Sequence, residues 1–140
     1  MKRREKIGRA CLSLNLKRAA RLVSRRYDEA LRPLGLTAGQ FSIMTVLLDS
    51  EAMSITAVAE VLGMDRTTLT RNLRPLRKRH LIESVEDPED RRSHGIVLTK
   101  SGASLLEAAI PLWEKAQKEN LKRLGKGAWP EVKITLDRLG

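Results

Sequence analysis

The residues with the clearest chemistry lie in a short basic stretch that begins at Asp65. Long basic side chains and threonine hydroxyls share it, and no acidic residue lies between Arg66 and Arg79. A guanidinium group can pair with guanine O6 and N7, and small hydroxyls can approach base edges and thymine methyl groups in the major groove of DNA. The candidate DNA-binding residues are Arg66, Thr67, Thr68, Thr70, Arg71, Arg74 and Lys78, together with Ser54 at the start of the preceding helix.

Residues at the two ends of this stretch are expected to contact different parts of the DNA. Arg71 and the threonines would read bases, whereas Arg77, Lys78 and Arg79 are better placed for phosphates or for solvent. The alternative is an ordinary solvated basic face. Such a face is more often built from Glu and Lys than from Thr and Arg, which favours the DNA-binding interpretation.

A second candidate contact lies in the charged, turn-rich insert at residues 86–95. Arg91 and Arg92 occupy the tip of this insert. An arginine at a loop tip can enter the minor groove, where narrow A-tract segments have an enhanced negative potential. The neighbouring carboxylates would repel phosphate, so at least one of them should pair with an arginine and orient it. The alternative is a surface turn whose acidic and basic residues satisfy each other.

The whole chain is strongly basic, with a formal net charge of +10. This surplus favours a polyanionic partner, either nucleic acid or an anionic membrane surface. Ten Lys or Arg residues and one Glu lie between Lys2 and Arg26. A second hypothesis is therefore a basic helical protein that binds RNA or an anionic membrane surface without sequence specificity. A membrane-active helix needs a bulky apolar and aromatic face. Since Tyr27 is the only aromatic residue here, we expect no membrane partner.

Other kinds of chemistry find little support. The single cysteine, Cys11, excludes an intramolecular disulfide and any multi-cysteine zinc site. His80 and His94 lie far apart without neighbouring ligands, so no metal site is expected. No phosphate-binding loop, nucleophile elbow or carboxylate pair is present, which predicts neither an enzyme nor a cofactor. The chain shows no signal peptide and no apolar run of membrane-spanning length, and a cytoplasmic location is expected.

Apolar residues at spacings of three and four predict mostly helices around this site. The expected helices are 7–34, 38–49, 54–63, 66–80, 101–124 and 129–139, with short β-prone runs at 82–85 and 96–98. Thr37, Ser54 and Asp65 are the expected N-caps, and Gly63 should end the third helix. The expected buried face of that helix is Ile55, Val58, Ala59, Val61 and Leu62. Pro75 should kink or loosen the fourth helix after Leu73, because it lacks a backbone donor.

This order predicts a mainly α fold with a small β-hairpin wing, that is, a winged helix-turn-helix flanked by further helices. The expected division is an N-terminal dimerisation helix at 1–34, a DNA-binding module at 37–100 and C-terminal dimerisation helices at 101–140. A first helix of about 28 residues would span about 40 Å. That length suits packing against another subunit better than packing within a small core.

Four segments in this order closely resemble the MarR family of bacterial transcriptional regulators. They are 36–41 (LTAGQF), 63–71 (GMDRTTLTR), 87–93 (DPEDRRS) and 98–102 (LTKSG). The most specific element is the Asp-x-Arg-Ser signature formed by Asp90, Arg92 and Ser93. The resemblance covers essentially the whole chain.

The resemblance implies a homodimer whose two winged modules bind a pseudo-palindromic operator in double-stranded DNA. It implies that Arg92 enters the minor groove and that Asp90 or Asp65 holds this arginine in place. Members commonly act as repressors, and a small phenolic or anionic effector often releases them from DNA. One branch of the family senses hydroperoxides through an early cysteine. Cys11 is displaced by about two residues from that position and lacks the surrounding tyrosines, which favours a buried cysteine over a redox sensor.

Overall fold

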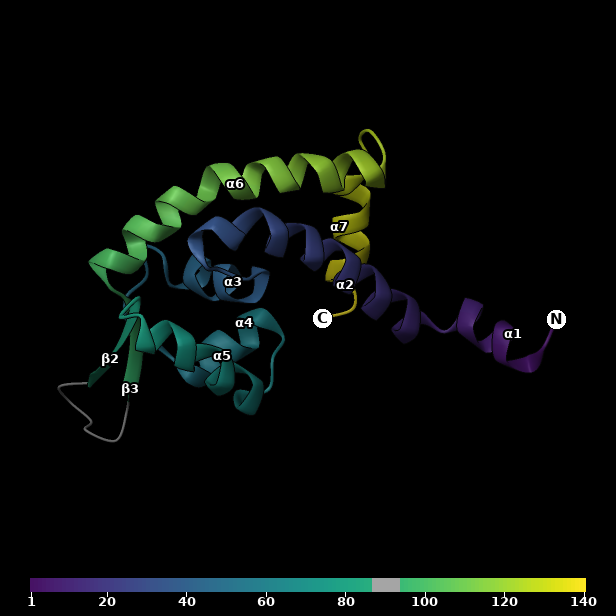
Figure 1. Cartoon of the computed structure of the whole chain (residues 1–140). Coiled ribbons are helices and arrows are strands. Elements are labelled where there is room, and N and C mark those ends of the chain that lie inside the picture. Colours follow the sequence, from purple (N-terminus) through teal and green to yellow (C-terminus); the bar gives the residue numbers. More distant parts are fainter. Residues whose placement is uncertain (87–93) are drawn as a thin grey trace.

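A computed structural model describes residues 1–86 and 94–140 of the chain. Its elements are α1 (Arg3–Ala10), α2 (Leu12–Leu31), the 3-10 turn η1 (Arg32–Leu34), α3 (Ala38–Leu47), β1 (Met53–Ser54), α4 (Ile55–Leu62), α5 (Arg66–Lys78), β2 (Ile82–Glu86), β3 (His94–Leu98), α6 (Lys100–Leu124) and α7 (Trp129–Asp137). Figure 1 shows α6 lying along α2, with α3, α4 and α5 below them and the strands at one end. The expected fold class, mainly helical with a small sheet, is confirmed.

The predicted helix at 7–34 is wrong in its continuity. The backbone leaves helical geometry at Cys11 (φ −70°, ψ 112°), which separates α1 from α2. The last three residues of the predicted helix form the 3-10 turn η1 rather than α-helix. The side chain of Asn15 donates to the carbonyl oxygens of Gly8 (3.1 Å) and Cys11 (2.8 Å), which stabilises the break. Asparagine side chains compete in this way with helical backbone bonds. As a result, α1 projects from the body, as Figure 1 shows, and all of its residues except Gly8 are exposed.

The predicted starts of the three central helices are confirmed. Thr37 accepts a hydrogen bond from the backbone of Gln40, Ser54 from that of Ala57, and Asp65 from that of Thr68. Each bond satisfies one of the backbone donors that a helix N-terminus leaves free. Their ends lie slightly earlier than predicted for α3 and α5, which stop at Leu47 and Lys78.

Gly63 and Pro75 were both expected to affect the helices in which they lie. Gly63 ends α4 in the left-handed region (φ +65°), as expected. Pro75 lies inside α5, which continues through it from Arg66 to Lys78, as predicted, and the expected kink after Leu73 stays a prediction. Leu73 and Leu76 are completely buried on either side of Pro75, and the ring itself is exposed. The core contacts of this helix therefore hold it together across the missing donor.

The strands form an antiparallel sheet in the order β1-β3-β2. Ile82 pairs with Leu98 and Glu86 with His94, which confirms the predicted hairpin. The two-residue strand β1 was not predicted, and it brings Met53 opposite Ile96. The wing tip, with the predicted Asp90, Arg91 and Arg92, lies outside the described residues.

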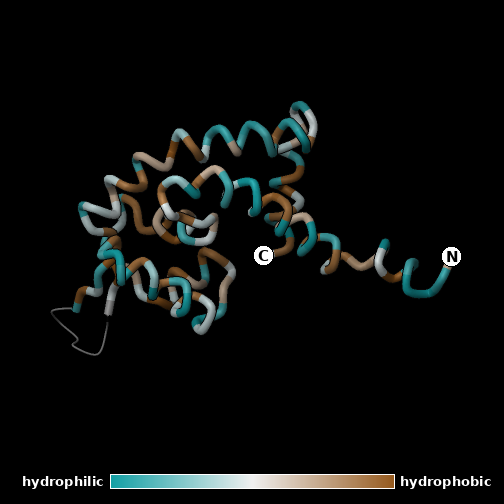
Figure 2. The backbone as a smooth tube through the Cα atoms, in the orientation of Figure 1, coloured by the Kyte–Doolittle hydropathy of each residue, from teal (hydrophilic) through white to brown (hydrophobic). Residues whose placement is uncertain are grey.

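One cluster of buried residues extends through all three predicted segments. It includes Leu31 from α2, Met44 from α3, Leu73 from α5 and Leu106 from α6. Along α2, α5 and α6 apolar residues recur among hydrophilic ones, as Figure 2 shows. Apolar residues that recur every three or four positions allow one face of a helix to be buried. Val61 was predicted to lie on the buried face of α4, but this prediction is wrong, because 64% of the residue is exposed.

Candidate nucleic-acid interface

The basic helix α5 is held by one face and presents the other to solvent. Leu69, Leu73 and Leu76 are completely buried and recur at spacings of four and three, so they anchor one face in the core. Arg71 and Arg74 project from the opposite face and are exposed. The sequence thus specifies a helix whose basic side is accessible at Arg66, Arg71 and Arg74.

Five of the predicted contact residues lie together on this exposed face. They line a shallow hollow of about 470 Å³ and are Arg66, Thr67, Thr70, Arg71 and Arg74. No carboxylate is among the described residues that line the hollow, so its potential is set by three guanidinium groups. Guanidinium groups bind phosphate or guanine through paired hydrogen bonds, and the hydroxyls add short-range donors and acceptors. The arrangement fits a DNA backbone and groove edge.

Thr68 is hydrogen-bonded to Asp65, the predicted N-cap of α5. The Asp65 carboxylate accepts from the backbone N–H of Thr68 (2.7 Å) and from its hydroxyl (2.8 Å). These bonds, first the backbone one and then the hydroxyl one, hold the pKa of Asp65 below its ordinary value. Thr68 therefore has its hydroxyl proton engaged in the cap. Whether Asp65 also orients Arg92 stays a prediction, because Arg92 is outside the described residues.

The remaining basic residues of α5 differ in their surroundings. Lys78 is exposed at the end of the helix, as a phosphate contact requires. Arg77 is half-buried and donates to the hydroxyl of Ser84 on β2 (3.3 Å). Arg79 points away from the hollow and donates to the carbonyl oxygens of Gly35 (2.9 Å) and Leu34 (3.0 Å). No pattern in the sequence predicts this contact, because its partners lie 44 and 45 residues away.

Ser54 and the wing frame the interface from the other elements. The Ser54 hydroxyl caps α4 through the backbone of Ala57 (3.0 Å), and the residue stays exposed. The two strands that lead to the wing are paired along their described length. Arg91 and Arg92, on which the minor-groove contact depends, fall in the part of the chain that the structure does not describe. Their roles stay predictions.

Comparison with known proteins agrees with this geometry. A sequence profile of the MarR family matches residues 36–94. The transcriptional regulator HosA of Escherichia coli O111:H- is 32% identical over 89 residues, which are 64% of this chain and 66% of that protein. The organic hydroperoxide resistance transcriptional regulator of Bacillus subtilis (strain 168) is 30% identical over 112 residues, which are 76% of each protein. The chain belongs to the MarR family of transcriptional regulators.

A solved structure extends the likeness to the whole MarR-family fold. The M. tuberculosis transcriptional regulator MOSR, crystallised in complex with DNA, is 38% identical to this chain. The match covers 92% of both chains with a TM-score of 0.82. It confirms the winged helix architecture, and these relatives are transcriptional regulators rather than enzymes.

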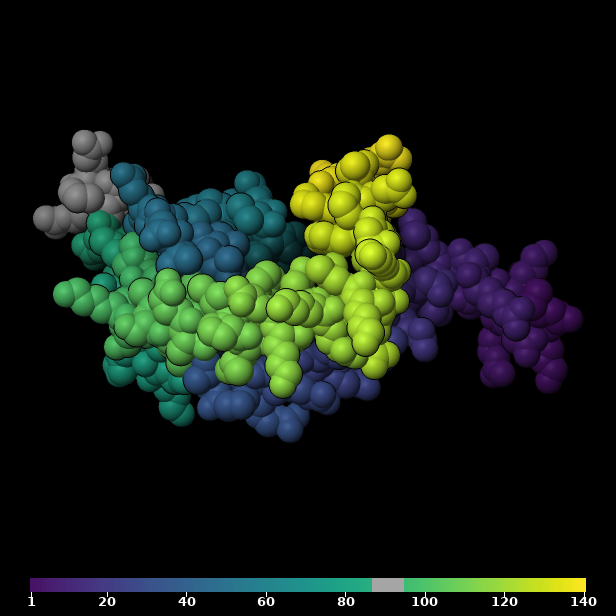
Figure 3. All heavy atoms as spheres, turned by 90° about the horizontal axis from the view of Figure 1, so that it is seen from above, coloured from purple at the N-terminus to yellow at the C-terminus, as the bar shows by residue number. Residues whose placement is uncertain are grey.

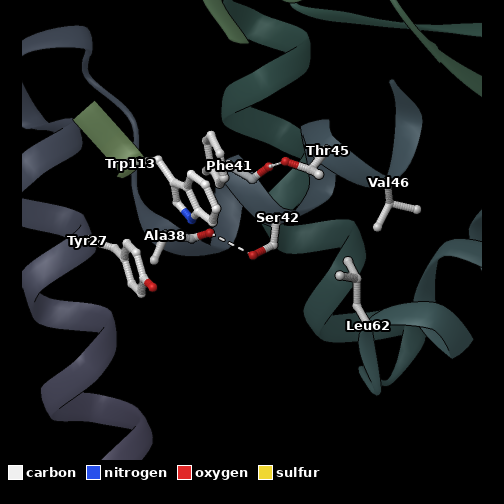
Figure 4. Close-up of a pocket in the computed structure, with 8 residues that line it drawn as sticks. All are labelled: Tyr27, Ala38, Phe41, Ser42, Thr45, Val46, Leu62 and Trp113. Carbon is white, nitrogen blue, oxygen red and sulfur yellow. Dashed lines mark hydrogen bonds between the residues drawn. The ribbon is translucent and has the colours of Figure 1, made fainter. Parts of the chain in front are cut away.

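The MarR-family chain also has an aromatic pocket of about 380 Å³, drawn in Figure 4. It is lined by Tyr27, Ala38, Phe41, Ser42, Thr45, Val46, Leu62 and Trp113, from α2, α3, α4 and α6. Phe41 and Trp113 stack with ring centroids 6.0 Å apart and an interplanar angle of 15°. The hydroxyls of Ser42 and Thr45 donate to the backbone carbonyls of Ala38 and Phe41.

The resemblance implies an effector site between the dimerisation helices and the DNA-binding module, but the residues that line this pocket were not predicted. The chain contains only one Tyr, one Phe and two Trp, and three of these four aromatic residues line the pocket. When most residues of a scarce type line one pocket, their gathering indicates a binding site. It becomes readable only once the fold brings together positions 27, 41 and 113.

A second hollow, an apolar groove of about 560 Å³, lies between α2, α6 and α7. Its lining includes Val23, Leu121, Trp129 and Leu136. Figure 3 shows α7 as a mass set apart beside the end of α6. None of the residues of α7, all of which the structure describes, is buried, and Ile134 is 54% exposed.

Two other predictions concern isolated residues. Cys11 is half-buried at the break between α1 and α2, rather than buried as predicted. Within residues 1–86 and 94–140, no group of three or more His, Cys, Asp or Glu side chains could hold a metal ion. In the same part of the chain, no helix is long and apolar enough to cross a membrane.

Proposed function

We propose that this chain regulates transcription as a homodimer that binds a pseudo-palindromic operator and acts as a repressor. The observation that carries the proposal is the hollow on α5, where Arg66, Arg71 and Arg74 gather around two threonines without a carboxylate among the described lining residues. In this role α5 lies in the major groove. Arg71 reads a guanine edge, Thr67 and Thr70 contact base edges or thymine methyl groups, and Arg66 and Arg74 bind flanking phosphates.

Five further residues complete the proposed interface. Lys78 binds a phosphate at the far end of α5, and Ser54 and Thr68 contribute at helix N-termini, where backbone N–H groups favour anions. Arg91 and Arg92 enter the adjacent minor groove, with Asp90 or Asp65 orienting Arg92. The role is one of binding alone, without catalysis, cofactor or membrane partner, in the cytoplasm.

The proposed dimer buries the groove between α2, α6 and α7 against a second copy. Exposed apolar side chains line or flank this groove: Val23, Leu124, Trp129, Ile134, Leu136 and Leu139. A contiguous apolar surface of this kind marks an interaction site on a globular protein. The two α5 helices of such a dimer would enter successive major grooves, so half-sites should lie about 10 bp apart.

The proposed effector is a small phenolic or anionic aromatic compound that occupies the pocket of Figure 4. Stacked Phe41 and Trp113 and the nearby Tyr27 offer aromatic faces, and the pocket touches both a long helix and the helix-turn-helix. A ligand here would bear on α2, α3, α4 and α6 at once. Binding would therefore alter how the DNA-binding helices sit on the rest of the protein.

Selection of bound duplexes from a random pool tests the proposed function. We expect a two-fold consensus with half-sites about one helical turn apart. The substitution Arg71→Ala should weaken binding to that duplex by about 1–3 kcal/mol and relax base preference at one position in each half-site. Unchanged affinity and preference would mean that the reading face of α5 is assigned wrongly.

The same material separates this function from the alternative. A basic protein that binds RNA or anionic membranes would show no preferred duplex and would sediment with anionic liposomes at matched salt. Binding to liposomes without duplex preference would replace the proposed function by that alternative.

A further inference from the structure

Arg79, the residue that ends α5, connects that helix to the far side of the fold. Its two terminal nitrogens donate to neighbouring carbonyl groups, Nη1 to Gly35 (2.9 Å) and Nη2 to Leu34 (3.0 Å). The guanidinium is planar and presents its donors as a rigid fork, which matches two adjacent carbonyl oxygens. These carbonyls close the 3-10 turn η1, so the cation also lies at the electronegative end of a helix.

The local sequence is arranged to permit this approach. Gly35 has a φ of +65°, a conformation that favours glycine. A Cβ atom built on Gly35 would lie 3.2 Å from Nη1 of Arg79, closer than such atoms normally approach. Glycine is therefore needed at this turn for its conformation and for the space that the guanidinium occupies.

The turn that Arg79 holds is the junction between α2 and α3. The backbone N–H of Leu36 donates to the carbonyl of Leu31 (3.3 Å), and that of Ala38 to the carboxylate of Asp28 on α2 (2.7 Å). Leu31 and Leu36 are buried in the core. The end of α2 is thus fixed to the start of α3, and Arg79 fixes the end of α5 to the same point.

Lys78 and Arg79 are adjacent basic residues with different surroundings. Both residues are exposed, but the two terminal nitrogens of Arg79 donate to carbonyl groups of Gly35 and Leu34, whereas Lys78 lies at the end of α5 beside the proposed DNA-facing surface. Charge alone would assign both to phosphates. The geometry separates a residue that contacts DNA from a residue that sets where the DNA-contacting helix lies.

We propose that Arg79 is a positioning residue that fixes the recognition helix relative to α2, and thereby sets the half-site spacing that the dimer accepts. This rests on the proposed function, because spacing has meaning only for a dimer on an operator. If both α5 helices are held rigidly against the dimerisation helices, the dimer binds best to operators with one half-site spacing. Helices released at their C-terminal ends tolerate neighbouring spacings.

The experiment compares Arg79→Met with Lys78→Met, a matched pair that removes one positive charge at successive positions. Affinity is measured for the selected duplex and for duplexes with one base pair added or removed between the half-sites, each across a range of salt concentrations. For Arg79→Met we expect the ratio of affinities between correct and altered spacing to fall roughly tenfold, with an unchanged salt dependence. For Lys78→Met we expect an unchanged ratio and a salt slope shallower by about 0.9 per lost phosphate contact.

A second variant perturbs the same contact without changing charge. Gly35→Ala should relax spacing preference in the same way, because the added Cβ crowds the guanidinium of Arg79 and strains the turn that it binds. Thermal unfolding of each variant is followed in parallel. A lowered unfolding temperature with an intact spacing preference would reduce Arg79 to a local structural role and overturn the proposal.

The remaining outcomes are equally decisive. A shallower salt slope for Arg79→Met, equal to that of Lys78→Met, would make Arg79 a phosphate contact and also overturn the proposal. If the unaltered protein selects no preferred duplex, the proposed function itself fails, and this is seen before any variant is compared.

Discussion

The two ends of α5 both carry arginine but are held in different ways. At the first end, Asp65 caps the helix through Thr68, only three residues away, and the contact is entirely local. At the other end, Arg79 reaches the turn after α2, 44 residues earlier in the chain. The first end is organised by its own sequence, and the second by the fold.

This difference teaches where a basic residue can be assigned from sequence. Near a local cap, helical periodicity decides which side chains face outward, so Arg71 and Arg74 could be placed on one accessible face. Near a tertiary contact, periodicity says nothing about what lies opposite. Arg77 and Arg79 share the charge of Lys78, yet both are bonded to protein groups.

The largest expected effect concerns the buried face that holds both ends. Leu73 is completely buried between them, so Leu73→Ala should lower the free energy of unfolding by about 2–5 kcal/mol. Urea unfolding at fixed protein concentration measures this loss. The neighbouring Arg74→Ala is the matched control, because an exposed substitution should change stability by less than about 0.5 kcal/mol while weakening DNA binding. Equal losses of stability in the two variants would contradict the division of α5 into an anchored and a free face.

The second expected effect concerns the surroundings of the tertiary end. A Cβ atom on Gly102 would overlap the carbonyl oxygen of Leu81 and lie 2.8 Å from a methyl group of Leu98. Gly102→Ala should therefore force α6 away from the segment that follows α5, at a cost of about 1–3 kcal/mol. Ser101→Ala, on the same helical turn and exposed, serves as the control in the same unfolding measurement. An unchanged stability for Gly102→Ala would show that this approach is not tight.

The same two kinds of contact explain how far sequence reasoning reached in the fold. Caps at Thr37, Ser54 and Asp65 were predictable because donor and acceptor are three residues apart. The break at Cys11 was not, since it depends on how the side chain of Asn15 competes with the helix. The passage of α5 through Pro75 was predicted, and burial of Leu73 and Leu76 on either side explains why the lost donor does not end the helix.

The features of the candidate site also divide into those set by local spacing and those set by tertiary contacts. The gathering of Arg66, Thr67, Thr70, Arg71 and Arg74 follows from helical spacing and was foreseen. The engagement of the Thr68 hydroxyl in the cap was not, although its spacing from Asp65 could have suggested it. The aromatic pocket and the Arg79 contact needed the tertiary structure, since each joins residues from distant segments.

The smallest expected effect tests the local end by pH. Hydrogen bonds from Thr68 lower the pKa of Asp65 from its ordinary value of 3.8, so the ionised carboxylate favours the folded state. This contribution is present above about pH 4 and is lost as the pH falls through the lowered pKa. Asp65→Ala should reduce the unfolding temperature by a few degrees at pH 7, and the difference from the unaltered protein should shrink below pH 4.

Asp65→Asn separates capping from charge in that experiment. Asparagine caps helices about as well as aspartate, so this variant should keep most of the stability at pH 7 and lose only the acid-dependent part. A difference between Asp65→Ala and the unaltered protein that persists undiminished at pH 3 would show that the Asp65 carboxylate does not stabilise this end through its charge. In that case the hydrogen bonds of the cap, rather than the charge of Asp65, would stabilise the N-terminal end of α5.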